Sequence, residues 1–346
     1  MSDLLACFAY PGDLTTPTGG YAYGRRVLGE IGASGVRLEP LPLPEAFPHP
    51  SQADVEAAIE TLWGVPAACP ILLDGLAGGA LPGDALRQVQ APVVMLCHHP
   101  LALETGVPPG RARALKETEV SALAAVAHVI TTSETTARIL VSDFGVPADR
   151  LTVAPPGTDA AARASGSPAS DLNILSVGSI SRRKGHHLLI DALAPLKDML
   201  WSLRVVGAGL DPAYREELDA QIVAGSLEGR ISFLGALDAD ELEAIYAGSD
   251  LFVLASQYEG FGMAFTEAMA RGLPVVGCPC GAVPEATRGA ALLVPAAELS
   301  EALAPLIADA EARRDLGERC WQASQAFQRW PETAGTIADA LKEATR

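Results

Sequence analysis

The sequence is poor in basic residues, in aromatic residues and in long apolar runs. Lys and Arg total 25 against 42 Asp and Glu, which gives a formal net charge of -17 over 346 residues. Such a surface repels polyanions, so the composition argues against nucleic-acid binding. No uninterrupted apolar stretch approaches the roughly 20 residues that a membrane-spanning helix needs. We therefore expect neither a nucleic-acid partner nor a transmembrane segment.

Cysteines and targeting signals are also scarce. The six cysteines are scattered and lie mostly in or beside apolar runs, so we interpret them as reduced core residues. The start, Met1-Ser2-Asp3, lacks the features of a signal peptide, and we expect a cytoplasmic protein. A short basic strip, Arg111, Arg113 and Lys116, leaves open a peripheral contact at the inner face of the membrane. On an acidic domain such a strip is more often a solvated helix face.

Apolar residues make up 49% of the chain, and its length predicts about two domains. Short β-type runs alternate with helical patterns twice, before and after the Pro- and Gly-rich stretch Pro155–Ala169, which we interpret as a linker. This alternation predicts an α/β protein with two doubly wound, Rossmann-like domains whose parallel sheets are covered on both faces. We assign residues 1–160 and 161–328 to them and expect them to face one another across a cleft at the carboxyl ends of the strands.

The β-type runs before the linker are Leu4–Tyr10, Val36–Leu43, Ile71–Leu76, Val93–Cys97, His128–Ser133 and Leu151–Ala154. Those after it are Asn173–Val177, Leu203–Val206, Ile231–Leu234, Leu251–Ala255, Pro274–Cys278 and Ala291–Val294. Helical patterns lie between most of these runs and fill the chain from Ala297 onward, with an interruption near Trp330-Pro331.

Two carboxylates eight residues apart bracket a glycine turn in the second half. Glu259 is followed by Gly260, Gly262 and then Glu267, between a buried strand and a helix start. The glycines allow the backbone to approach a ligand, and the helix N-terminus suits a phosphate. Two carboxylates beside such a turn fit the hydroxyl groups of a sugar nucleotide. The alternative is an ordinary capped helix with surface acids.

Three consecutive cations, Arg182, Arg183 and Lys184, form the second motif. They follow the strand that ends at Val177 and precede a helix start at Gly185. Cations joined to helix amides can hold a diphosphate and neutralise it as a leaving group. A solvated basic turn is the alternative.

The first half offers weaker candidates. Gly19-Gly20 ends the first loop before a helix and could touch phosphate or sugar, or could form a tight turn. His98 and His99 end a strand, where a histidine can exchange hydrogen bonds with a substrate hydroxyl. Adjacent residues on an extended chain point to opposite faces, and no third ligand is evident, which disfavours a metal site. Glu104 is a further, weaker candidate.

Several familiar motifs are missing. The run Val206-Gly-Ala-Gly209 begins like a dinucleotide loop, but Pro212 stands where the third glycine belongs. The nucleophile elbow of serine hydrolases and the P-loop pattern are not found. These absences argue against nicotinamide binding, serine hydrolysis and P-loop chemistry.

With these motifs the chain resembles the family-4 retaining glycosyltransferases, which have the GT-B fold. The resemblance is carried by the E-x7-E pattern of Glu259 and Glu267, the Arg-Lys-Gly loop after a strand, and Gly-Ala-Val-Pro-Glu285. It is strongest from Asn173 to about Ser324 and looser in the N-terminal half. It implies an N-terminal acceptor domain, a C-terminal nucleotide-sugar domain, and a last helix within 329–346 that returns to the N-terminal domain.

The resemblance also implies roles for individual residues. Glu259 would contact the donor hexose and Glu267 the ribose, while Lys184 would bind the diphosphate. The family's usual Arg is replaced by Ser179, so the second cationic contact is assigned to Arg183, with Arg182 next. The remaining candidates are Gly262, Met263 and Thr266 near the distal phosphate, Gly19 and Gly20 in the N-terminal domain, and His98 near the reacting sugar.

The implied activity is transfer of a hexosyl group from a nucleotide-diphosphate sugar to an acceptor hydroxyl with retention. A UDP-sugar is favoured, no metal or other cofactor is expected, and the acceptor is a lipid, a glycan or a small metabolite. The alternatives are a GT-B sugar-nucleotide epimerase and a non-catalytic bilobal sugar-binding protein.

Overall fold

The structure, a computed structural model, describes residues 3–167, 171–209 and 211–346. Met1 and Ser2, on which part of the targeting argument rests, and the end of the expected linker at Ala169 lie outside these residues. The chain divides into two compact units, residues 1–157 with 328–346 and residues 158–327. Each unit contains one six-stranded sheet, and every strand pairing in both sheets is parallel.

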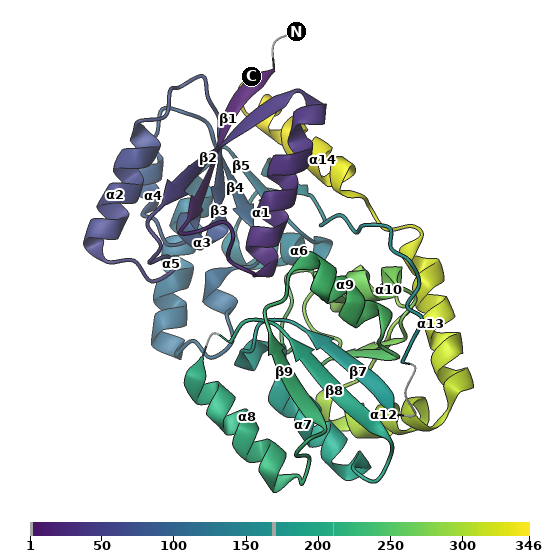
Figure 1. Cartoon of the computed structure of the whole chain (residues 1–346). Helices are drawn as coiled ribbons and strands as arrows, with labels where there is room; N and C mark the ends of the chain where they lie inside the picture. Colours follow the sequence, from purple (N-terminus) through teal and green to yellow (C-terminus); the bar gives the residue numbers. More distant parts are fainter. Residues whose placement is uncertain (1–2, 168–170, 210) are drawn as a thin grey trace. The chain divides into compact units, whose positions relative to one another are not determined.

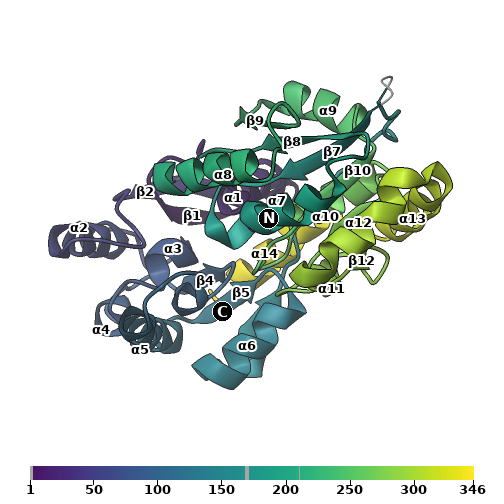
Figure 2. The same cartoon turned by 90° about the horizontal axis from the view of Figure 1, so that it is seen from below.

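The sheet of the first unit has the order β2-β1-β3-β4-β5-β6. Its strands are β1 Leu4–Pro11, β2 Val36–Leu43, β3 Ile71–Asp74, β4 Val93–Cys97, β5 His128–Thr131 and β6 Leu151–Val153. The helices are α1 Gly19–Glu30, α2 Gln52–Trp63, α3 Gly75–Gly78, α4 Gly83–Leu86, α5 Pro109–Ala125, α6 Glu134–Phe144 and α14 Trp330–Glu343. Both Figure 1 and Figure 2 show α4 and α5 side by side, and these two helices are in contact.

The second unit repeats the design with the order β12-β11-β10-β7-β8-β9. Its strands are β7 Leu172–Val177, β8 Trp201–Val206, β9 Ile231–Gly235, β10 Leu251–Leu254, β11 Val275–Gly277 and β12 Leu292–Leu293. The helices are α7 His186–Leu193, α8 Pro212–Ala224, α9 Ala239–Ala247, α10 Met263–Ala270, α11 Val283–Ala286, α12 Leu299–Ala308 and α13 Ala310–Ser324. The expected pair of doubly wound α/β domains is therefore confirmed.

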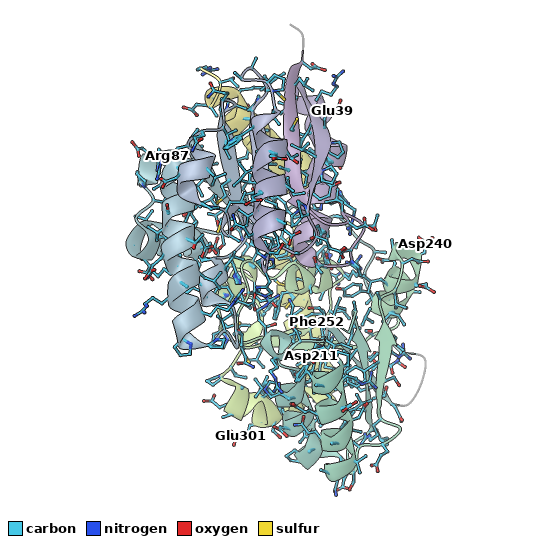
Figure 3. The ribbon with its side chains drawn as sticks, turned by 90° about the vertical axis from the view of Figure 1, so that its left-hand side faces the viewer. Glu39, Arg87, Asp211, Asp240, Phe252 and Glu301 are labelled. Atoms are coloured by element: carbon cyan, nitrogen blue, oxygen red, sulfur yellow. The ribbon has the colours of Figure 1, made fainter. Side chains whose placement is uncertain are left out.

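Local sequence explains where many of these elements begin. Among the described residues, six helices start at a serine or aspartate whose side chain accepts a hydrogen bond from a first-turn amide, as N-cap residues do: Ser51, Asp74, Ser133, Asp211, Asp238 and Asp309. The strands read as near-continuous apolar runs because parallel sheets are buried on both faces. Phe252 of β10 is fully buried, whereas Asp240 and Glu301 are exposed and project outward (Figure 3).

Some expected bounds are wrong by a few residues. The strand expected to reach Leu76 ends at Asp74, because the Asp74 side chain accepts the amide of Leu76 and starts α3. The helix that starts at His186 gives way to a 3-10 turn at Ala194–Leu196, which contains a proline. The short helices α3, α4 and α11 have only four residues each, too few for a periodic signal.

The last helix, α14, belongs to the first unit. Its Trp330 ring packs against Tyr23 with ring centroids 5.6 Å apart, and the Arg26 guanidinium lies over the same indole. The Thr333 hydroxyl donates to the Pro155 carbonyl at 2.7 Å. In Figure 1 this helix, in yellow, lies beside α1, and the two are in contact. The chain therefore returns to its first unit after completing the second.

Candidate functional site

Two loops of the second unit meet at the carboxyl ends of the neighbouring strands β7 and β10. Gly185, which precedes α7, has a φ of +67°, and a Cβ there would lie 1.9 Å from the Ala255 carbonyl oxygen. The Gln257 amide donates to the Arg183 carbonyl at 2.7 Å. Only glycine permits this close approach of the two backbones. The Arg-Arg-Lys loop is thus fixed against the loop that carries Glu259.

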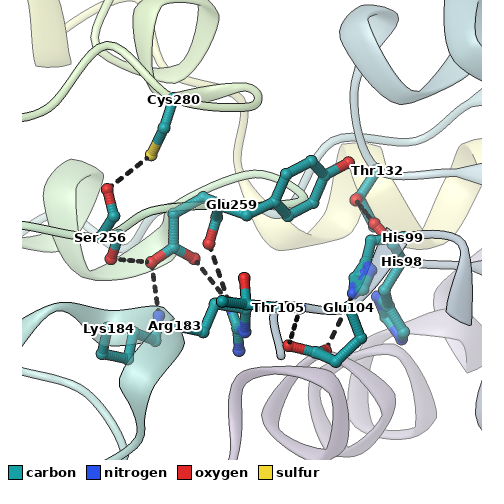
Figure 4. A network of polar contacts seen from close by, with 11 residues as sticks. His98, His99, Glu104, Thr105, Thr132, Arg183, Lys184, Ser256, Glu259 and Cys280 are labelled. Atoms are coloured by element: carbon teal, nitrogen blue, oxygen red, sulfur yellow. Dashed lines mark hydrogen bonds and ion pairs between the residues drawn. The ribbon is translucent and has the colours of Figure 1, made fainter. Parts of the chain in front are cut away.

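Within this edge, Lys184 and Ser256 both bind one carboxylate. Lys184 Nζ lies 2.6 Å from Glu259 Oε1, and the Ser256 hydroxyl donates to the same oxygen at 2.6 Å. Arg183 forms an ion pair with Glu259 Oε2 at 3.6 Å and donates to the Tyr258 carbonyl at 3.0 Å (Figure 4). The predicted catalytic residues of this unit therefore form one network.

The charge state of Glu259 follows from this network. Its side chain is 6% exposed, and burial alone would raise the pKa of the carboxyl. The charges of Lys184 and Arg183 and the hydrogen bonds from Lys184 and Ser256 outweigh burial, so the pKa of Glu259 lies below its usual range. Glu259 is consequently an ionised acceptor fixed at the centre of the site.

The loop that carries Glu259 ends at Gly262 and leads directly into α10. Gly262 has a φ of +104°, in the left-handed region that favours glycine, and Met263 is the first helical residue. The first amides of a helix lack partners within the helix and carry its positive dipole end. The Thr266 side chain turns inward: its hydroxyl donates to the Met263 carbonyl at 2.9 Å and accepts from Thr158 at 3.0 Å.

Glu267 has a different environment. The Tyr246 hydroxyl donates to Glu267 Oε2 at 3.2 Å. Burial raises the pKa of the Glu267 carboxyl, while Arg271, Tyr246 and Lys184 act in the opposite direction. The charge of Lys184 therefore acts on both glutamates of the E-x7-E pattern, and the three residues belong to one edge of the unit. The pKa of Glu259 is thus lowered, whereas that of Glu267 is raised.

Two predicted donor-binding residues lie outside the Glu259 network. Arg182 forms an ion pair with Glu217 of α8, with Nη2 and Oε2 2.6 Å apart, and its guanidinium lies over the Tyr214 ring. Ser179 lies in the loop after β7 and is partly buried. Of the two arginines assigned to the second cationic contact, Arg183 is the one that contacts Glu259.

Candidates of the first unit gather at the carboxyl ends of β3 and β4. Gly20 lies beside the His98 ring, which a Cβ at this position would meet at 3.5 Å, an ordinary van der Waals contact. Nε2 of His98 lies 3.8 Å from Oδ2 of Asp74, the last residue of β3. Gly19, the first residue of α1, is exposed.

His99 and Glu104 also pair, with Nε2 and Oε2 3.0 Å apart (Figure 4). In the part of the chain that the structure describes, no group of three or more His, Cys, Asp or Glu residues is arranged to hold a metal ion. Nor does any described helix combine the length and apolar character that crossing a bilayer requires.

Sequence reasoning missed several polar partners. Ser256 stands three residues before Glu259, and this local spacing could have suggested the contact. Asp74 and Tyr246 gave no such signal, since they reach His98 and Glu267 only through the fold.

Two family models match the chain. The model described as "Glycosyl transferases group 1" matches residues 158–323, and that described as "Glycosyltransferase Family 4" matches residues 74–162. Together they extend from Asp74 into α13.

Similar proteins have related descriptions. The D-inositol 3-phosphate glycosyltransferase of Arthrobacter sp. is 29% identical over 70% of this chain and 62% of its own length. The chain spans less than two thirds of the length of this relative and of other curated relatives that it matches. Among solved structures, sucrose-phosphate synthase from Thermosynechococcus elongatus has a TM-score of 0.80 at 22% identity and 98% coverage of both chains. Anabaena HepE in complex with UDP and glucose has a TM-score of 0.76 at 20% identity, covering 98% of this chain and 100% of its own.

Proposed function

Because this chain belongs to the group 1 and family 4 glycosyltransferases, with their GT-B fold, we propose that it transfers a hexosyl group from a nucleotide-diphosphate sugar to an acceptor hydroxyl with retention of configuration. The Lys184–Glu259–Ser256 network, formed by the loops that precede α7 and α10, carries this proposal. A UDP-sugar is the favoured donor, and the crystallisation of the HepE protein with UDP and glucose supports that choice.

In this reaction the bond between the sugar C1 and the diphosphate oxygen breaks, and a bond from C1 to the acceptor oxygen forms on the same face. The departing diphosphate takes the acceptor proton. Lys184, Arg183 and the amides at Gly262 and Met263 would stabilise the developing negative charge on the diphosphate. This positive charge would serve where other enzymes use a metal ion, so we propose a reaction independent of metal.

Glu259 is an acceptor of hydrogen bonds in this scheme. Ionised and held by three partners, it would orient the hexose hydroxyls, and Glu267 would hold the ribose. His98 would contact the reacting sugar from the first unit. We place the protein in the cytoplasm and leave its acceptor among lipids, glycans and small metabolites.

The test compares Lys184→Ala with Lys197→Ala, a change at an exposed lysine of the same unit. UDP release from UDP-sugars is measured with and without EDTA. Loss of one charged stabiliser is expected to lower turnover about 100-fold, while Lys197→Ala and EDTA leave it unchanged. Equal turnover of the two variants would refute the assignment, and melting curves establish that both are folded.

Product analysis separates the alternatives. An epimerase converts the donor sugar without an acceptor, and a sugar-binding protein releases no UDP. The alternative activities predict no acceptor-dependent glycoside.

A further inference from the structure

Two cysteine thiols of the first unit are in contact. The Sγ atoms of Cys7 and Cys69 lie 3.5 Å apart, within hydrogen-bond distance for sulfur, and all six cysteines of the chain are free. The two residues are 62 positions apart in the sequence, so only folding brings their thiols together. The chemistry proposed above does not use this pair.

The backbone holds the two thiols close to bonding distance. Cys7 lies in β1, and its amide donates to the Pro70 carbonyl at 3.0 Å. Pro70 directly follows Cys69 and precedes β3, which pairs with β1. Because an S–S bond is about 2.05 Å long, the two sulfurs must approach by about 1.5 Å. Cys69 ends a turn whose residues 66–68 are exposed, which leaves its side chain room for this movement.

The two thiols differ in access and in protonation. Cys7 is half-buried, whereas Cys69 is 5% exposed. Burial first, and then the hydrogen bond and the charge of Cys7, raise the pKa of the Cys69 thiol to about 12. The charge of Glu39, which is exposed and lies beside Cys7 on β2, acts in the same direction (Figure 3). Because the thiolate is the nucleophile, Cys7 is the thiol that attacks an external molecule.

The other four cysteines have different surroundings. Cys97, Cys278 and Cys320 are buried, and the Cys280 thiol donates to the Ser256 carbonyl at 3.0 Å. In the part of the chain that the structure describes, Cys7 and Cys69 are the one pair of thiols in hydrogen-bond contact. Oxidation by a disulfide should therefore be selective for this pair.

We propose that Cys7 and Cys69 form a thiol–disulfide exchange site, which low-molecular-weight disulfides of the glutathione class convert reversibly into an intramolecular disulfide. This inference is independent of the proposed function. The bond would join β1 to the segment before β3 and close a loop of 62 positions. A cross-link over so long a loop restricts the unfolded chain and stabilises the folded one.

The exchange has two steps. The Cys7 thiolate attacks one sulfur of the small disulfide, whose S–S bond breaks and releases one half as a thiolate. Cys69 Sγ then loses its proton and attacks Cys7 Sγ, which releases the second half. Two protein thiols are thus oxidised to one disulfide, and the small disulfide is reduced to two thiols that take up the two protons.

The test oxidises the folded protein and maps the products. Oxidised glutathione is added to the wild type, Cys7→Ser, Cys69→Ser and Cys280→Ser, the last a change at a partly exposed cysteine of the second unit. Remaining thiols are alkylated, and peptides are identified by mass spectrometry without reductant. We expect a Cys7–Cys69 link in the wild type and in Cys280→Ser, at least about tenfold in excess over any other linked pair. Dithiothreitol should restore both thiols.

The variants test the order of the two steps. Cys69→Ser should retain one glutathione on Cys7, whereas Cys7→Ser should leave Cys69 unmodified. Glutathione on Cys69 in Cys7→Ser would overturn this order. Melting curves establish that the variants are folded, and the wild-type result stands without them.

Two outcomes in the wild type would overturn the proposal as a whole. One is the absence of the link, or the same mixture of links in folded protein as in protein oxidised in urea. The other is unfolding of the linked protein at a lower urea concentration than the reduced protein, because the bond would then not fit the native fold. We expect the linked form to unfold at the higher concentration.

Discussion

Glu119 is a buried carboxyl that supports the loop after His98. It lies on α5, is 2% exposed, and accepts the amides of Leu101 at 2.8 Å and Ala102 at 3.2 Å. These amides begin the 3-10 turn that follows His98-His99-Pro100. We predict that this single side chain makes the stability of the first unit depend on pH.

The magnitude follows from its pKa. Burial raises the pKa of Glu119 from 4.5 to about 7, although the two backbone hydrogen bonds lower it in part. Because the folded-state pKa lies above the unfolded one, the protonated form is favoured by folding. The stabilisation that Glu119 adds to the free energy of unfolding is fully present below pH 4.5 and is lost as the pH rises through about 7. The full difference corresponds to about 3 kcal/mol of unfolding free energy.

The assay is urea unfolding of the wild type, Glu119→Gln and Glu117→Gln between pH 5 and pH 8. Glu117 lies on the same helix in an exposed, 3.9 Å ion pair with Arg113. The stability of the wild type relative to Glu119→Gln should fall by about 2–3 kcal/mol over this range. Glu117→Gln should keep the wild-type pH dependence. If Glu119→Gln retains it as well, the reasoning fails.

Three further predictions concern the second unit. Gly185→Ala forces a Cβ against the Ala255 carbonyl oxygen and should lower the free energy of unfolding in urea by about 2–4 kcal/mol. Gly29→Ala, on the open surface of α1, should not lower it. Equal effects of the two substitutions would contradict this. His186 is 2% exposed, and neither of its ring nitrogens has a hydrogen-bond partner in the described chain. Burial, and then the charges of Lys184 and His187, lower the pKa of His186 to about 4. Its contribution to stability falls as the pH drops from 6.5 towards 4, so His186→Leu should raise the melting temperature more at pH 5 than at pH 7; a lower melting temperature would contradict it. Tyr246→Phe removes the donor to Glu267 and should weaken UDP binding about fivefold in calorimetry; an unchanged Kd would separate Glu267 from nucleotide binding.

The sequence identified most of the fold because its signals are local. Apolar runs of strand length, separated by capped helical patterns, are sufficient to indicate parallel sheets. The motif around Glu259 and the cations before Gly185 were recognisable because each lies on one continuous segment. Errors concentrated in elements of four residues, such as α3 and α11, where no period can develop.

The sequence by itself thus determined the two parallel α/β units, the family, and the two segments from which a donor site would be built. Only the tertiary structure decided which charges meet. In the folded chain Lys184 forms an ion pair with Glu259, whereas Arg182 forms one with Glu217 instead. In the first unit, Asp74 lies beside His98. The reason is physical: Coulomb interactions and hydrogen bonds act over a few ångströms of space, and the chain's folding, not the spacing along it, sets those distances.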